Sequence, residues 1–127
     1  MMKTYQVLGR DIQVDPNVQY LKPSGVTSRE LMRGLARFDP IDVESFLDVV
    51  RGLPPEHHRD LYDGLELHLM ECRSVLGFIE ATEEPYNAEL MVEDGLMEGP
   101  KPQRTQELKD GLRNTIRLFE ELQKCRR

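Results

Sequence analysis

The stretch LYDGLELHLMECRSVLGFI, residues 61–79, decides the fold class. Its heptad positions alternate in steps of four and three residues, the spacing of a helix that packs lengthwise against another helix. These positions are Leu61, Leu65, His68, Cys72, Val75 and Ile79. Gly64 and Gly77 are tolerable inside a helix, so we predict one long helix from Pro55 to about Thr82. Further apolar residues lie on its other faces, which favours a central place in the fold.

A second heptad stripe lies near the end of the chain. We predict a helix over residues 105–125, and its stripe consists of Leu108, Leu112, Thr115, Phe119 and Leu122. The two stripes are natural packing partners.

Two shorter helices are predicted before the long one. Thr27 and Glu30 form a capping box, which opens a helix over about residues 28–38 with Phe38 on its apolar stripe. Asp39 then caps a second helix with Pro40 at its first position. The stripe of that helix is Val43, Phe46, Leu47 and Val50, and Gly52 with Pro54 ends it. Residues 28–82 thus hold three helices.

The N-terminal residues 3–14 predict a β-hairpin. Residues 4–8 and 11–14 are rich in β-forming side chains and are separated by a turn at Gly9. Two strands alone are marginal in water, so the hairpin must pack on helices or on another chain. Residues 15–25 contain Pro16, Pro23 and Gly25 and predict an irregular connection. The expected fold is a mainly α, small helical bundle of about four helices, two of them long, with an N-terminal β-hairpin.

The length of 127 residues favours a single domain, residues 1–127. The chain shows no signal-peptide pattern and no apolar run long enough to span a bilayer, so we expect no membrane association and a cytoplasmic location. Cys72 and Cys125 lie in separate predicted helices, which indicates no disulfide framework and fits a reducing compartment.

The charge distribution is the most informative feature for function. Residues 39–98 hold three Lys or Arg and sixteen Asp or Glu, a net charge of −13, whereas both flanking segments are basic. Pairing of the basic last helix with the acidic long helix accounts for part of this asymmetry. The surplus predicts an acidic face that attracts another protein with a basic surface, and direct nucleic-acid binding is not expected. Its carboxylates are Asp42, Glu44, Asp48, Asp60 and Asp63.

Residues 83–104 predict a long acidic loop. Tyr86, Leu90 and Met91 lie there among carboxylates, a composition typical of segments that order on a partner. The same side chains could instead dock on the protein's own core.

No sequence motif for catalysis or for a cofactor is present, so no enzyme activity and no cofactor are expected. His68 and Cys72 share one helix face and are weak candidates for a metal site. Both are heptad positions, so core packing is the stronger interpretation. A buried histidine there could also fix the register between helices, and His68→Leu would then raise stability while loosening oligomeric specificity.

Three functional hypotheses follow. The first is a non-enzymatic protein–protein interaction module, an adaptor, assembly factor or inhibitor, whose acidic helical surface meets a basic partner and can mimic nucleic-acid charge. The second is a structural subunit of a homo-oligomer, most simply a two-fold homodimer. The third is a helical-bundle metal-binding protein.

Overall fold

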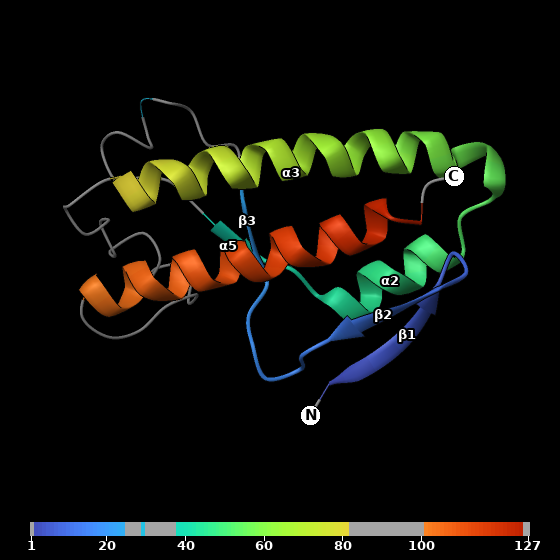
Figure 1. The fold of residues 1–127 in the computed structure, drawn as a ribbon, viewed down its shortest axis with the longest axis horizontal. Helices are drawn as coiled ribbons and strands as arrows, with labels where there is room; N and C mark the ends of the chain where they lie inside the picture. The colour runs from blue at the N-terminus through green and yellow to red at the C-terminus, as the bar shows by residue number, and fades with distance from the viewer. Residues whose placement is uncertain (1, 25–28, 30–37, 82–100, 126–127) are drawn as a thin grey trace.

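A computed structural model describes residues 2–24, 29, 38–81 and 101–125. These residues form two antiparallel strand pairs, one short 3₁₀ turn and three α-helices (Figure 1). In chain order they are β1 (Lys3–Val7), β2 (Arg10–Val14), β3 (Leu21–Pro23), β4 (Phe38–Pro40), α2 (Val43–Arg51), η1 (Pro55–His57), α3 (His58–Ala81) and α5 (Lys101–Gln123).

Helix α5 occupies the middle of the arrangement. Helix α3 runs antiparallel along one side of it, and α2 with the β1–β2 hairpin covers the other side (Figure 1). The sequence analysis placed the long helix α3 at the centre, and this expectation was wrong. The apolar residues Leu67 and Met70 on its other faces are exposed to solvent rather than packed.

The β1–β2 hairpin confirms the predicted N-terminal element. Its register pairs Val7 with Arg10 across a two-residue loop, in which Leu8 has φ 52° and Gly9 has φ 83°. Two positive φ values in succession are typical of a type I′ turn, which matches the twist of a hairpin. Ile12 and Val14 face the core at 1% and 6% exposure, so the hairpin packs on helices as expected.

Strands β3 and β4 are elements that the sequence analysis missed. Leu21 pairs with Pro40 and Pro23 with Phe38, while the amide of Ile41 donates to the carbonyl of Tyr20 at 2.8 Å. Because antiparallel pairs alternate, both prolines occupy positions whose amides face away from the partner strand. Their missing N–H groups therefore cost no ladder hydrogen bond.

The two short predicted helices are corrected accordingly. The described residues contain three α-helices rather than four. The predicted helix over 28–38 falls outside the described residues except at Arg29 and at Phe38, and Phe38 lies in β4 with 0% exposure. Asp39 and Pro40 also belong to β4. The cap of α2 is Asp42, whose carboxylate accepts from the amide of Ser45 at 3.2 Å, and α2 ends before Gly52 as predicted.

The pairing of the two heptad stripes is confirmed. All five predicted positions of α5 are buried, and on α3 Leu65, Cys72, Val75 and Ile79 are buried while Leu61 and His68 are half-buried. Helix α5 begins at Lys101, four residues before the predicted start, with Pro102 in the first turn, where its missing N–H is harmless. None of the described helices is both long and apolar enough to cross a membrane.

Candidate functional site

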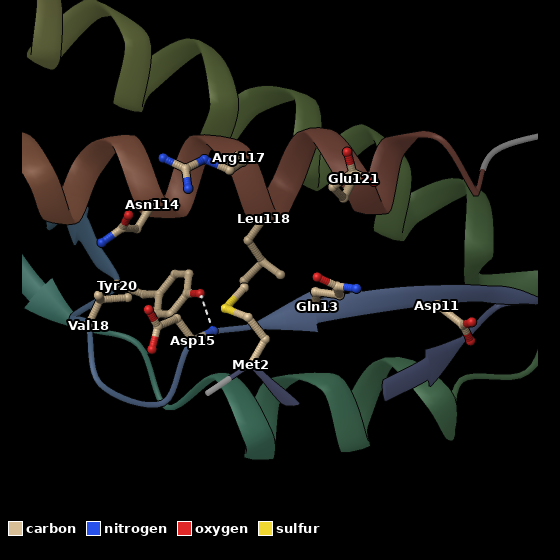
Figure 2. A pocket seen from close by; sticks show the side chains of 10 residues that line it. All are labelled: Met2, Asp11, Gln13, Asp15, Val18, Tyr20, Asn114, Arg117, Leu118 and Glu121. Atoms are coloured by element: carbon tan, nitrogen blue, oxygen red, sulfur yellow. Dashed lines mark hydrogen bonds between the residues drawn. The ribbon is translucent and has the colours of Figure 1, made fainter. Parts of the chain in front are cut away.

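A groove of about 520 Å³ runs between strand β2 and helix α5 (Figure 2). Ten residues line it, from the position before β1, from β2, from the loop before β3 and from α5. Asp11 and Gln13 contribute the strand wall because their neighbours in sequence, Ile12 and Val14, point into the core.

One face of α5 forms the opposite wall. Asn114, Arg117, Leu118 and Glu121 are spaced at i, i+3, i+4 and i+7, so they lie along one side of the helix (Figure 2). Leu118 is 3% exposed and belongs to the core, which makes the deepest part of this wall apolar. The wall therefore has an apolar base with polar and charged side chains around it.

The loop between β2 and β3 closes one end of the groove. The amide of Asp15 donates to the hydroxyl of Tyr20 at 3.2 Å (Figure 2). The carboxylate of Asp15 also accepts from the amide of Asn17 at 2.9 Å. The side chain of Asn114 holds the same loop by donating to the carbonyl of Gln19 at 2.9 Å. These bonds fix Asp15 and Tyr20 at the end of β2.

The charges of the groove are only partly compensated. Glu121 lies 2.8 Å from Lys124 and 3.5 Å from Arg10, and its hydrogen bond with Lys124, more than any other contact, lowers the pKa of the carboxyl. Asp11 accepts a hydrogen bond from the neutral side-chain amide of Gln6 at 3.3 Å. Arg117 is exposed, with no ion-pair partner within the part of the chain that the structure describes.

A second surface is the solvent side of α3 together with the η1 turn that leads into it, which we call the outer stripe. It consists of residues spaced by 4, 3, 4 and 3, namely Glu56, Asp60, Asp63, Leu67 and Met70. All five are exposed, Leu67 at 66% and Met70 at 58%. Residues at this spacing share one side of a helix, so three carboxylates lead directly into two exposed apolar side chains.

The predicted acidic residues do not form one face. Asp42 caps α2 and borders a pocket of about 220 Å³ together with Glu44, and Asp48 is ion-paired with Arg51. Asp60 and Asp63 belong to the outer stripe of α3, and α2 and α3 lie on opposite sides of α5 (Figure 1). Tyr86, Leu90 and Met91 lie outside the described residues.

The ion pairs between α3 and α5 neutralise only part of the acidic charge of α3. Arg113 of α5 lies 3.6 Å from Glu80, and Arg73 of α3 lies 2.8 Å from Glu120, so the two ion pairs have opposite polarity. All four side chains are substantially exposed, and such pairs contribute little to stability. Neither pair involves Glu56 or Asp60 of the outer stripe.

The metal candidates His68 and Cys72 are part of the helix interface. The imidazole of His68 packs against the ring of Phe119 with 6.0 Å between centroids, and burial lowers its pKa. Cys72 is 1% exposed, and burial raises the pKa of its thiol to about 11. Both shifts reflect packing. Within the described ranges no three His, Cys, Asp or Glu side chains are grouped as a metal site.

No protein-family model, curated protein or solved structure matches the chain. The two candidate surfaces are therefore assigned from the residues of this chain alone. The sequence analysis had identified only part of them. It identified Asp60 and Asp63, but it placed Leu67 and Met70 on other faces of the helix and assigned them no part in binding. It also missed the groove, although the exposed alternation of Asp11 and Gln13 in the hairpin was a usable signal.

Proposed function

We propose that this protein is a non-enzymatic interaction module, an adaptor, assembly factor or inhibitor, that docks a basic partner protein on the outer stripe of α3. The observation that carries the proposal is the exposure of Leu67 and Met70 in line with the carboxylates that precede them on the helix. Single exposed apolar side chains are ordinary on protein surfaces. Leu67 and Met70 are neighbours on the helix surface and continue the spacing of the carboxylates that precede them. Together these side chains form a mixed acidic and apolar surface that fits a complementary helix.

The chemistry of the stripe specifies the partner. A helix that pairs with it needs Lys or Arg beside Glu56 and Asp60 and apolar side chains beside Leu67 and Met70. Carboxylates accelerate the approach of such a basic surface, and burial of the apolar residues supplies affinity. Where the partner's basic surface normally binds nucleic acid, the carboxylates would take the place of phosphates, and the protein would act as an inhibitor.

The test begins by identifying the partner at the stripe itself. A photo-crosslinking amino acid is placed at position 67, and in a matched control at position 49, where Val49 is 64% exposed on α2. The partner identified by crosslinking is then purified on its own. The dissociation constant of its complex is measured with the wild type and with the variants Asp60→Lys, Leu67→Ser and Val49→Ser. We expect Asp60→Lys and Leu67→Ser to weaken binding by about tenfold each, Val49→Ser to have no effect, and salt to weaken wild-type binding.

Two results would contradict the proposal. Crosslinking of position 67 only to other copies of this chain would favour the homo-oligomeric subunit instead. Equal affinity of the wild type and Asp60→Lys at all salt concentrations would show that the carboxylates have no part in recognition.

A further inference from the structure

Strand β2 has an edge that pairs with nothing among the described residues. The hairpin contains only β1 and β2, and Val7 and Arg10 close its turn as a hydrogen-bonded pair. Because antiparallel pairs alternate, the backbone N–H and C=O groups of Asp11 and Gln13 face away from β1. An edge of this kind is a template for another extended segment.

The groove described above runs along this edge. Asp11, Gln13 and Asp15 border it, and Leu118 and Tyr20 form its buried apolar base. Val18 and Met2, exposed at 39% and 49%, stand at its rim. The open edge thus borders a cavity with an apolar base, as a recognition site for an extended peptide requires.

From this geometry we infer that the groove accepts an extended basic segment of another protein, which adds to β2 as a third, antiparallel strand. Residues 11, 13 and 15 alternate with the core-facing Ile12 and Val14, so Asp11 and Asp15 present carboxylates four residues apart on the same side. The added strand therefore carries Lys or Arg opposite both. The side chains next to the two cations turn toward Leu118 and are apolar, and the central side chain lies opposite Gln13.

Charge favours this occupant over a second copy of the chain. Two-fold pairing of β2 with itself would bring four aspartates, Asp11 and Asp15 of each copy, to one ribbon. Arg117 is the only basic residue among the ten that line the groove, so each copy would bring one cation against its two aspartates. A strand bearing two cations balances Asp11 and Asp15 without that repulsion.

The probe is an acetylated and amidated peptide, Lys-Val-Thr-Val-Lys, titrated into the full-length ¹⁵N-labelled chain. Amide shifts are followed by NMR, and hydrogen exchange is measured with and without peptide. We expect saturable binding with slowed exchange at Asp11 and Gln13 and unchanged exchange at Thr4, whose amide faces the opposite edge of the hairpin. Replacing both lysines by glutamate should abolish binding.

Backbone pairing is tested separately from charge. Methylation of the threonine amide, which faces β2 in this register, should weaken binding by about tenfold, whereas methylation of the first valine amide should leave it nearly unchanged. In the protein, Gln13→Pro should weaken binding similarly, and Thr4→Pro is the matched control because Thr4 is the cross-strand partner of Gln13. The unfolding midpoint of each variant confirms that it is folded.

Several outcomes would overturn the inference. The first three are absence of peptide binding, an equal loss of affinity with either methylated peptide, and amide chemical-shift changes confined to α3. The fourth is a dimer in light scattering in which the amides of Asp11 and Gln13 are already protected from hydrogen exchange without peptide. Because the outer stripe of α3 is a different surface, Asp60→Lys should leave peptide binding intact. A negative result with the peptide therefore does not decide the proposed function of the outer stripe. A negative result at the outer stripe likewise does not decide whether the groove binds an extended segment.

Discussion

The hydroxyl of Thr115 on α5 donates a hydrogen bond to the backbone carbonyl of Leu21 in β3, with 2.7 Å between the two oxygens. Both residues are 0% exposed. Leu21 is paired with Pro40, so its carbonyl faces away from β4 and would otherwise be buried without a partner. A helix side chain therefore completes the hydrogen bonding of a strand and anchors β3 on α5.

Replacing Thr115 by valine should destabilise the protein by about 1–3 kcal/mol, because the shape is kept while the carbonyl of Leu21 loses its donor. Thr115→Ser keeps the hydroxyl and should cost less. Urea denaturation of the wild type and both variants measures the difference. A serine variant less stable than the valine variant would mean that the methyl group, and not the hydrogen bond, stabilises this contact.

Replacing Gly111 by alanine should also destabilise the protein, by about 1–3 kcal/mol. A Cβ at this position would lie 2.6 Å from Cδ1 and 2.7 Å from Cγ of Leu21, inside a packed core. Gly77 on α3 is the matched control, since nothing lies within 4 Å of a Cβ there. Gly77→Ala should stabilise by about 1 kcal/mol through helix propensity. Thermal or urea unfolding gives both values, and stabilisation by Gly111→Ala would refute the close approach of α5 and β3.

The pKa of His68 predicts a loss of stability in mild acid. Burial, with a smaller contribution from Lys22, lowers this pKa in the folded state. As the pH falls through the unfolded value of about 6.5, the unfolded chain binds a proton that the folded chain resists, so the free energy of unfolding decreases. His68→Leu should remove this component. Unfolding free energies at pH 5.5 and 7.5 test it, and the same pH dependence in both proteins would count against the shift.

The thiol of Cys72 should be unreactive in the folded protein. Burial raises its pKa to about 11, so thiolate is scarce at pH 8. A thiol-specific reagent such as Ellman's should modify Cys72 far more slowly in the native protein than in urea, with Cys125→Ala used to isolate the signal. The folded state resists ionisation, so stability should decrease as the pH rises above the unfolded value of about 8.5. Equal rates in buffer and urea would disprove the burial.

The elements with strong local patterns could be predicted from the sequence. The turn around Gly9, the stripe of Val43, Leu47 and Val50 and the two heptads each encode their structure within a few neighbouring residues. The structure confirms the hairpin, the end of α2 at Arg51 and the packing of α3 on α5. Leu8 is an exception to these local preferences. It adopts a positive φ, which is unusual for leucine, and its side chain packs on the core.

The candidate sites were harder to predict than the elements. Asp60 and Asp63 were chosen for their charge, but their alignment with Leu67 becomes informative only once α5 is seen to cover the opposite side of α3. The groove depends on the position of β2 relative to residues of α5 about a hundred positions later in the chain. The periodicity of a single segment does not predict how far β2 lies from α5 in the folded protein.

The sequence by itself determined the helices with strong apolar stripes, the hairpin and the acidic excess, because spacing and composition act over a few residues. Tertiary structure alone decided that Phe38, Asp39 and Pro40 form a strand and that a free strand edge borders a groove. Three-residue strands carry too little local preference to form alone, and β3 is held by Thr115 and by its close approach to Gly111. Long-range contacts therefore selected a strand at Phe38–Pro40, where local signals had predicted the end of one helix and the start of the next.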